Sequence, residues 1–344
     1  MTTQVPLNML ASAPTFRNRI INGAMVIDQR NSGALINPAV SGYTVDRMYY
    51  YQSQTSKGSI GQNAGSVTPP VGFSNYLGFT SSSAYSINST DQFLITQKIE
   101  GFNTADLNWG TANAKTVTLS FQVYSSLTGT FGGSLQNSTA NRCYPFSYTV
   151  SSANTWTTVS VTITGDTTGT WVGSTNGIGM IVNFSLASGT SQSATAGAWT
   201  GTSFITSATG ATSVVGTSGA TFYITGVQLE VGSSATGFEY RQYGQELALC
   251  QRYYQTLPYQ TLTAGAYATT AVSFRTYPYI LFRATPTVTY TGTVIEWVGV
   301  NTQTITSIGN NCGANKIQVD FSWTPAITQY VPMGSPPIQL SAEL

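Results

Sequence analysis

Short segments in which apolar and polar residues alternate make up most of the chain. Between Phe222 and Val231 the odd-numbered positions form one face and the even-numbered positions the other, which is the period-of-two signature of a β-strand. Turn-rich links such as Thr128-Gly129 and Gly132-Gly133 separate such segments. Many short strands between turns predict a β-sandwich or jelly roll. The predicted strands are Arg19–Ile27, Thr44–Gln52, Tyr76–Thr80, Gln92–Glu100, Thr116–Ser125, Cys143–Val150, Trp156–Thr164, Gly177–Leu186 and Thr221–Val231.

One later segment changes to a helical period. Between residues 245 and 255, Leu247, Cys250 and Tyr254 recur at i, i+3 and i+7. Pro258 prevents the helix from continuing. A helix of about three turns is marginal alone. We therefore expect Leu247, Cys250 and Tyr254 to be structural residues that pack against a neighbour.

The alternation resumes after this helix in a smaller region, with strands predicted at Tyr267–Thr276, Thr285–Thr291 and Lys316–Trp323. At roughly 150 residues per domain, 344 residues suggest two domains. The predicted fold class is all-β: a β-sandwich, a short connector helix and a smaller C-terminal β-domain. The boundaries that this prediction sets are an N-terminal arm at 1–15, the sandwich at 16–241, the connector at 242–258 and the C-terminal domain at 259–344.

A tract rich in Gly, Ala, Ser and Thr runs from Ser185 to Ser218. Its composition is compatible with a flexible linker or with an ordered loop. Trp199 and Phe204 are large side chains that offer anchors for an ordered loop. We therefore favour a long ordered loop within the sandwich.

Composition removes several classes of function. Charged residues make up 7% of the chain, against about 25% in an ordinary soluble protein, and the net charge is +1. The sequence gives no electrostatic reason to expect nucleic acid or an anionic membrane surface as a partner. No segment reaches the ~18 apolar residues of a membrane helix, and residues 1–13 lack the pattern of a signal peptide.

The side chains that most enzymes need are scarce. There is no histidine, and Cys143, Cys250 and Cys312 are far apart with no CxxC pair, so we expect no disulfide framework and synthesis in a reducing cytoplasm. Glycoside hydrolysis needs two carboxylates about 5–10 Å apart. The sequence pairs none, and we expect Glu239 to form an ion pair with Arg241. We therefore predict that the protein is not an enzyme.

Carbohydrate recognition needs aromatic faces together with amides and hydroxyls, and the chain is rich in both. Trp109, Trp171 and Trp199 stand in turn-like contexts and are the predicted glycan-binding residues, with core packing as the alternative for each. The run Tyr49–Tyr51 must point to both faces of its strand. We expect one face to be core and the other to be a binding surface or a subunit interface.

Three parts of the sequence carry a family resemblance. VQLEVGSSATGFEYRQYGQELALCQRYYQ (227–255), NRIINGAMVIDQRNSG with YTVDR (18–47) and the final LSAEL resemble segments of tail-fibre and virion-surface proteins of tailed bacteriophages. In that family the first segment ends a jelly roll similar to carbohydrate-binding modules and leads into a C-terminal β-domain. The resemblance covers most of the chain, although the middle third is generic β-sequence.

The resemblance implies roles for several residues. Asp46 and Arg47 match a DR pair of the family and are expected to form a structural anchor at the rim of the sandwich, with ligand binding as the alternative. Carbohydrate modules of this kind often hold a structural calcium, for which Asp28 and Asn22 are conceivable ligands. The sequence has no DxDxDG-like spacing and no other cofactor is expected.

The resemblance also implies a function. It predicts a non-enzymatic tail-fibre or receptor-binding protein that contacts host surface glycans, forms a homotrimer and attaches to other virion proteins through the arm at 1–15. The alternative for residues 1–15 is a frayed chain terminus. The predicted location is the virion. The alternative is a purely structural virion component, such as a collar, head-fibre or adaptor protein, whose jelly roll binds other virion proteins. A third and remote reading is a capsule-degrading hydrolase.

Overall fold

The computed structural model describes residues 17–257, 260–262, 271–276, 278, 280–290, 294–297, 302–323, 333–335 and 338–344. The chain divides into two compact units, 1–241 and 242–344, and each is described by itself. The predicted arm at 1–15 lies outside the described residues. Among the helices that the structure describes, none is long and apolar enough to cross a membrane.

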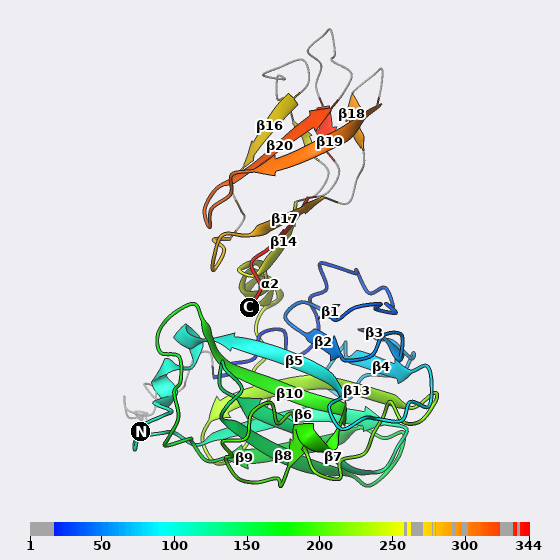
Figure 1. The fold of residues 1–344 in the computed structure, drawn as a ribbon, viewed down its shortest axis with the longest axis vertical. Helices are drawn as coiled ribbons and strands as arrows, with labels where there is room; N and C mark the ends of the chain where they lie inside the picture. The colour runs from blue at the N-terminus through cyan, green and yellow to red at the C-terminus, as the bar shows by residue number, and fades with distance from the viewer. Residues whose placement is uncertain are drawn as a thin grey trace, which may run out of the picture. The chain divides into compact units, whose positions relative to one another are not determined.

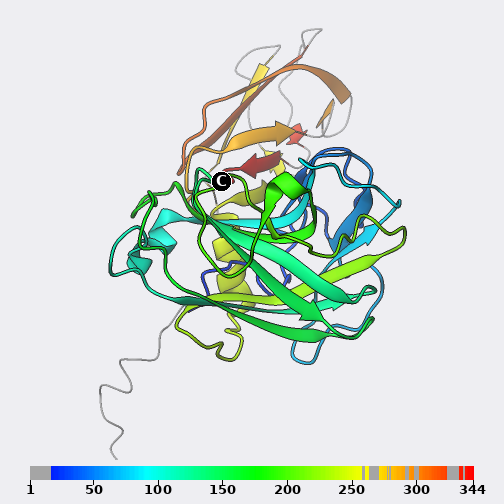
Figure 2. The same cartoon turned by 60° about the horizontal axis from the view of Figure 1, so that its bottom comes forward.

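The first unit is an antiparallel β-sandwich, and the predicted all-β jelly-roll class is confirmed (Figure 1). In the described part of this unit, one sheet has six strands in the order β1-β2-β5-β10-β7-β8 and the other has five in the order β3-β4-β13-β6-β9. Neighbouring strands within both sheets run antiparallel. Figure 2 shows the two sheets from a second direction, as stacked layers.

The bounds of the elements are as follows. The six-stranded sheet contains β1 (Gly42–Tyr43), β2 (Tyr49–Gln52), β5 (Gln92–Glu100), β10 (Ile178–Ser188), β7 (Gly129–Gln136) and β8 (Cys143–Val150). The five-stranded sheet contains β3 (Gly58–Gln62), β4 (Leu77–Ser81), β13 (Thr221–Val231), β6 (Val117–Ser125) and β9 (Thr157–Ile163). Short 3₁₀ turns η1 (Gly101–Asn103), η2 (Ala105–Leu107) and η3 (Thr190–Gln192) and a parallel pair, β11 (Ser193–Ala194) and β12 (Ser207–Ala208), lie in the connections.

Strand β5 shows how the alternation separates the two faces of a sheet. Phe93, Ile95 and Ile99 belong to the core that both sheets share. Burying one such side chain stabilises the fold by about 1.5–3 kcal/mol relative to leaving it exposed. Leu94 and Thr96 point to the other face, away from this core, yet both are buried as well. Something other than the second sheet therefore covers them.

Strand β7 was not predicted, because its glycines read as turn residues. Gly132 and Gly133 lie inside the strand, and close neighbours explain why glycine occurs there. A Cβ at Gly133 would lie 2.3 Å from the carbonyl oxygen of Asn183, and one at Gly132 would lie 2.4 Å from Oγ of Ser207. The prediction of a turn at Gly132-Gly133 is wrong because close packing, rather than a bend, excludes larger residues there.

The prediction of a first strand at Arg19–Ile27 is also wrong. Asn22 and Met25 have positive φ angles of 60° and 57°. The Asn22 amide donates to the carbonyls of Ile27 at 2.8 Å and Asp46 at 2.9 Å, and it accepts the Ile27 N–H at 3.0 Å. Asparagine tolerates the left-handed region because its short side chain bonds the nearby backbone. These local bonds replace a strand ladder.

The predicted strand Thr44–Gln52 is interrupted by a turn at Asp46 and Arg47. Arg47 has a positive φ of 69°, and its guanidinium donates to the Lys98 carbonyl at 2.6 Å. The Asp46 carboxylate lies 3.6 Å from the Arg30 guanidinium. Both turn residues are buried, and buried charges require ion pairs and hydrogen bonds. These contacts favour the structural role of the pair over a ligand-binding one.

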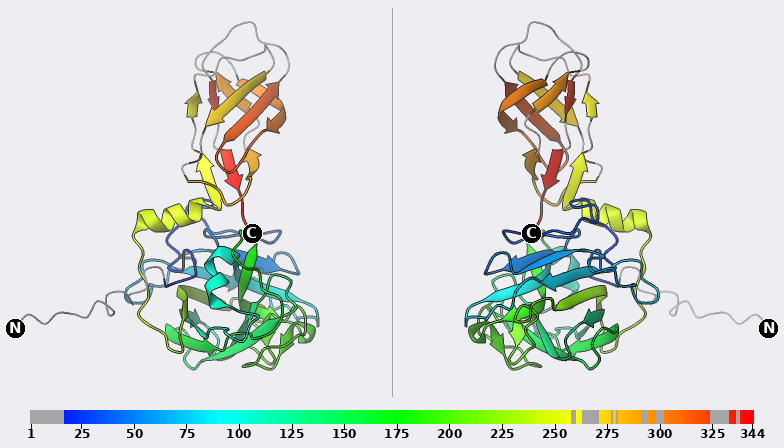
Figure 3. Two further views of the ribbon diagram at one scale, coloured as in Figure 1. Left: turned by 90° about the vertical axis from the view of Figure 1, so that its left-hand side faces the viewer. Right: turned by 90° about the vertical axis from the view of Figure 1, so that its right-hand side faces the viewer.

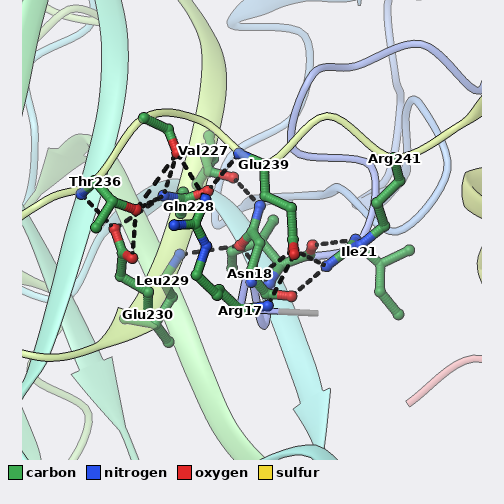
Figure 4. Close-up of polar contacts among 12 residues, drawn as sticks. Arg17, Asn18, Ile21, Val227, Gln228, Leu229, Glu230, Thr236, Glu239 and Arg241 are labelled. Atoms are coloured by element: carbon green, nitrogen blue, oxygen red, sulfur yellow. Dashed lines mark hydrogen bonds and ion pairs between the residues drawn. The ribbon is translucent and has the colours of Figure 1, made fainter. Parts of the chain in front are cut away.

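A polar network joins the beginning of the first unit to its end (Figure 4). The Asn18 amide donates to the Val227 carbonyl at 3.0 Å, and the Asn18 N–H donates to Glu239 at 2.9 Å. The Arg241 guanidinium donates to the Ile20 carbonyl at 3.0 Å and lies 3.5 Å from Glu239, so the predicted Glu239–Arg241 pair is confirmed. Residues 227–241 therefore close the sandwich against its N-terminal segment.

The second unit begins with helix α2 (Tyr243–Gln251), which leads into β14 (Tyr254–Leu257) (Figure 3). Among its described residues, a three-stranded sheet has the order β14-β22-β17, and a six-stranded sheet has the order β15-β21-β18-β19-β20-β16. The remaining bounds are β15 (Gln260–Leu262), β16 (Ala271–Thr276), β17 (Thr287–Tyr290), β18 (Val294–Trp297), β19 (Thr302–Asn310), β20 (Ile317–Trp323), β21 (Met333–Ser335) and β22 (Ile338–Ser341).

The helix is shorter than its apolar pattern predicts. It ends at Gln251, and Tyr254 lies in β14, where it pairs with Ser341 of β22. Cys250 and Tyr254 are both buried, whereas Leu247 is half-buried. Aromatic residues favour strands, and the backbone of residues 254–257 pairs with β22 instead of extending the helix. The helical prediction for residues 252–255 is therefore wrong.

Candidate functional site

The three predicted glycan-binding tryptophans come together in one place, here called the tryptophan cluster (Trp109, Trp171 and Trp199). Ring centroids lie 4.8 Å apart for Trp109–Trp171, 5.3 Å for Trp109–Trp199 and 5.5 Å for Trp171–Trp199. The interplanar angles are 81°, 78° and 84°, so every pair packs edge to face. Each ring thus presents an edge or a face to the other two.

The indole N–H groups of the tryptophan cluster are used within the protein. Trp109 donates to the Lys115 carbonyl at 2.7 Å, and Trp199 donates to the Thr164 carbonyl at 2.8 Å. Trp109 is only 7% exposed, and a cavity that it lines together with Trp171 measures about 60 Å³. That volume holds very few waters and no sugar ring. The geometry favours the packing alternative, while the glycan-binding role of these tryptophans stays a prediction.

A bidentate ion pair supports the cluster from one side. Arg142 donates to the two carboxylate oxygens of Asp166 at 2.8 and 2.6 Å, and the Trp171 indole donates to Asp166 at 3.2 Å. Burial alone would raise the pKa of Asp166, but hydrogen bonds from Arg142, Thr168 and Trp171 lower the pKa below its ordinary value. The carboxylate is therefore held ionised as part of the fold.

A larger hollow lies on the outer face of the six-stranded sheet. It measures about 390 Å³ and is here called the Tyr51 groove. Its floor comes from the outward positions of β2, β5, β10 and β7, and its walls come from the loops at 138–140 and 204–206. Leu94 and Thr96, both buried, lie on this floor. The residues that define the groove are Tyr49, Tyr51, Gln92, Leu94, Thr96, Lys98, Gln136, Ala140, Asn183 and Phe204.

Two aromatic rings at this groove remain open to solvent. Tyr51 is 40% exposed and Phe204 is 59% exposed. Phe204 has a positive φ of 61°, which is unusual for a bulky residue, and its N–H is held by the Ala140 carbonyl at 2.7 Å. Such strained residues concentrate at ligand-binding sites. Here a strained backbone leaves the Phe204 ring in water while the next residue, Ile205, is buried.

The groove floor includes both apolar side chains, such as Leu94, and amides and hydroxyls, of which those of Thr96, Gln136 and Asn183 are buried and bonded within the protein. The Asn183 side chain accepts a hydrogen bond from the Thr96 hydroxyl and donates to Ser134 at 3.1 Å. Gln136 donates to the Ile205 carbonyl at 2.7 Å. Lys98 is the one charged side chain among the described residues that line the groove. Aromatic rings beside fixed amides and hydroxyls suit the C–H faces and hydroxyl groups of a sugar.

Part of this groove can be predicted from the sequence. The run Tyr49–Tyr51 was expected to divide between core and surface, and Tyr50 is buried while Tyr51 is exposed, as expected. Phe204 was expected to anchor its loop, and that expectation is wrong because the neighbouring Ile205 occupies the buried position instead. The walls join loops more than sixty residues apart, so no local pattern reveals them.

The conceivable calcium ligands have other partners. Asn22 is committed to the Ile27 and Asp46 backbone, and Asp28 accepts the N–H groups of Asn31 at 3.0 Å and Gly33 at 2.8 Å. In the part of the chain that the structure describes, no group of three or more His, Cys, Asp or Glu side chains forms a metal-binding cluster.

Glu230 also has a structural environment. Its carboxylate accepts the N–H of Thr236 at 2.8 Å, the hydroxyl of Thr236 at 2.7 Å and the amide of Gln228 at 2.9 Å (Figure 4). These bonds hold the turn that follows β13. Glu239 is bound to the N-terminal segment, as described above.

No protein-family model matches the sequence, and no curated protein matches it. Solved structures similar to the chain include the enzymatically active domain of tailspike protein 4 of bacteriophage CBA120, at 11% identity, a TM-score of 0.36 and coverage of 63% of this chain. The chain spans 22% of the length of that tailspike chain.

Two further similar structures are a carbohydrate-binding module and a phage baseplate protein. The carbohydrate-binding module TmCBM61, solved with β-1,4-galactotriose, matches at 9% identity and a TM-score of 0.32, covering 63% of this chain and 99% of the module. The tripod from the baseplate of bacteriophage Tuc2009 matches at 13% identity and a TM-score of 0.24, covering 60% of this chain and 57% of the tripod chain. These identities establish no family.

Proposed function

We propose that the protein is a non-enzymatic glycan-binding protein and that the Tyr51 groove is its binding site. The observation that carries this proposal is the exposed, strained Phe204, which lines one groove together with the exposed Tyr51. A sugar would stack on these rings and exchange hydrogen bonds with the less buried polar side chains of the groove, such as Gln92 and Thr139. Glu230 and Glu239, the acidic residues of the family-like segment, serve the closure of the sandwich.

The biological setting that we propose is a tail fibre or receptor-binding protein on a phage virion. It rests on the sequence resemblance of residues 227–255, 18–47 and the final LSAEL. The proposed assembly is a homotrimer attached to other virion proteins through residues 1–15. Several weak grooves in one trimer would bind a host surface through avidity. Mass determination of the purified full-length protein by light scattering tests the trimer.

The first experiment measures binding of fluorescent full-length protein to permissive host cells before and after periodate oxidation of surface glycans. We expect periodate to abolish binding. We expect Phe204→Ala to weaken binding about tenfold, the change that a loss of roughly 1.4 kcal/mol produces. Phe102→Ala is the matched control, because Phe102 is also a phenylalanine, is 56% exposed and lies outside the groove.

The other outcomes separate the competing functions. Binding that survives periodate and is insensitive to Phe204→Ala would contradict glycan recognition at this groove. Absence of binding by an intact oligomer would favour the structural virion component. Release of new reducing ends from host polysaccharide would contradict the non-enzymatic assignment.

A further inference from the structure

A second hollow lies on the outer face of the five-stranded sheet. It measures about 300 Å³ and is here called the Tyr240 groove (Phe73, Phe238, Tyr240, Ser120, Gln122 and Ser160). Leu119, Phe121 and Val123 of β6 belong to the shared core, so the alternate positions of that strand face the groove. The two grooves therefore occupy the outer faces of opposite sheets in one sandwich.

Three rings form one wall of the Tyr240 groove. Centroids lie 5.0 Å apart for Phe73–Phe238, 4.9 Å for Phe238–Tyr240 and 5.5 Å for Phe73–Tyr240. Tyr240 nevertheless remains 59% exposed. Packing against the other two rings limits its rotation, so ligand binding would cost little side-chain entropy.

Two glycines make room for these rings. A Cβ at Gly226, where φ is +62°, would lie 2.6 Å from Cζ of Phe73. A Cβ at Gly72, where φ is +92°, would lie 2.7 Å from the hydroxyl oxygen of Tyr240. Both the backbone angle and the space favour glycine at these positions. The backbone is thus shaped to hold the rings in place.

The opposite wall is polar and uncharged. Ser120, Gln122 and Ser160 come from neighbouring strands β6 and β9, and the Gln122 amide donates to the Thr158 hydroxyl at 2.9 Å. None of the described residues that line the groove carries an ionisable acid or base other than the Tyr240 phenol. A charged ligand would lose hydration here without gaining a counter-charge. A neutral ligand rich in hydroxyl groups would not.

We propose that the Tyr240 groove is a second glycan-binding site, separate from the Tyr51 groove, and that it takes a neutral saccharide. Fixed rings would stack on the sugar, while the hydroxyl and amide wall would bond its hydroxyl groups. One protomer would then hold two glycan segments on opposite faces, which raises the valency of the protein without a second copy of the domain.

The test is photo-crosslinking of the full-length protein with diazirine-tagged oligosaccharides from hydrolysed host surface polysaccharide, separated into neutral and acidic pools. Peptide mapping by mass spectrometry locates the labels. We expect the neutral pool to label peptides containing Phe73 or Tyr240 saturably. We expect Ser160→Arg, at an exposed position of edge strand β9, to reduce that labelling about tenfold. Ser147→Arg is the matched control, at an exposed serine of edge strand β8 outside both grooves.

Each result decides between the two sites. Labels confined to the Tyr51 groove would overturn the second site and leave the proposed function intact. Labels in the Tyr240 groove that Ser160→Arg leaves unchanged would do the same. Labels confined to the Tyr240 groove would support the second site and overturn the placement of the first. Saturable labelling of the Tyr240 groove by the acidic pool alone would overturn its neutral specificity. No saturable labelling anywhere would overturn both sites.

Discussion

In the tryptophan cluster three indole rings pack edge to face against one another, whereas in the Tyr51 groove Tyr51 and Phe204 remain open to water. The indole N–H groups of Trp109 and Trp199 donate to backbone carbonyls, and that of Trp171 donates to the Asp166 carboxylate. The cavity of the cluster measures about 60 Å³, against about 390 Å³ for the groove. Aromatic residue type is thus common to both regions, and exposure distinguishes them. Unfilled contact area, rather than aromatic content, therefore marks a site that can take a ligand.

The largest expected effect is on stability, at the centre of the tryptophan cluster. Trp109→Ala removes a ring that touches both other indoles and a hydrogen bond to the Lys115 carbonyl. We expect it to lower the free energy of unfolding by about 3–5 kcal/mol, as other large-to-alanine core changes do. Urea unfolding of the variant measures this. Trp109→Phe, which keeps a ring, should cost less.

Measuring the binding of the folded Trp109→Phe variant to host cells completes this test. Because the cluster lies outside the Tyr51 groove, we expect Trp109→Phe to bind host cells as tightly as the wild type. If Trp109→Phe is stable but loses periodate-sensitive binding, the glycan site is the tryptophan cluster and not the Tyr51 groove.

The ion pair beside the cluster gives the next largest effect, and it depends on pH. Asp166→Asn weakens charge-assisted bonds from Arg142 and is expected to lower stability by about 2 kcal/mol at pH 7. The folded-state pKa of Asp166 is lowered, against about 3.9 in the unfolded chain. Its contribution is therefore present above about pH 4 and is lost as the pH falls through the folded-state pKa.

Unfolding of the wild type and Asp166→Asn at decreasing pH checks the sign. We expect the difference in stability between the two proteins to shrink below about pH 4. Asp91 has a lowered pKa as well, since hydrogen bonds from Asn88, Ser53 and Tyr85 outweigh the effect of its burial, so the variant should retain some acid sensitivity. A difference that stays constant through this range would contradict the assigned role of the Asp166 carboxylate.

Local patterns predicted the strands well and the site only in part. The predicted bounds of Gln92–Glu100, Cys143–Val150 and Thr221–Val231 agree with the structure, because alternation reports on burial of one face. Strand β7 was not predicted because its glycines are required by close contacts with Asn183 and Ser207, which are distant in sequence. The grooves could not be predicted either, because they also depend on residues that are distant in sequence. A strand pattern identifies the outer face of a sheet but does not show which loops enclose it.

The next prediction concerns the solvent-exposed rings of the Tyr51 groove, where we expect a change in affinity of intermediate size. We expect Tyr51→Ala to weaken host-cell binding about tenfold, because a stacking ring is removed from the groove. Tyr51→Phe keeps the ring and is the matched variant, for which we expect about a twofold change. Equal losses in both variants would show that the hydroxyl, rather than the ring, contacts the ligand.

The smallest expected effect is also the most specific, because stability and binding should move in opposite directions. Phe204→Gly removes a side chain that is 59% exposed and relieves a positive φ of 61°. A left-handed conformation costs a residue with a Cβ roughly 1–2 kcal/mol, part of which glycine loses again through its freer unfolded chain. We expect a net stabilisation of about 0.5 kcal/mol together with periodate-sensitive binding that is about tenfold weaker, as for Phe204→Ala.

Phe102→Gly provides the control for this last change. Phe102 lies in the 3₁₀ turn η1 with similar exposure, and its φ is not positive, so glycine there should destabilise the protein by about 0.5–1 kcal/mol and leave binding unchanged. If Phe204→Gly destabilises the protein as much as Phe102→Gly does, the Phe204 ring contributes to folding and its strain has another cause. Stabilisation together with weaker binding would instead mean that the fold tolerates a strained residue because the ligand needs its ring.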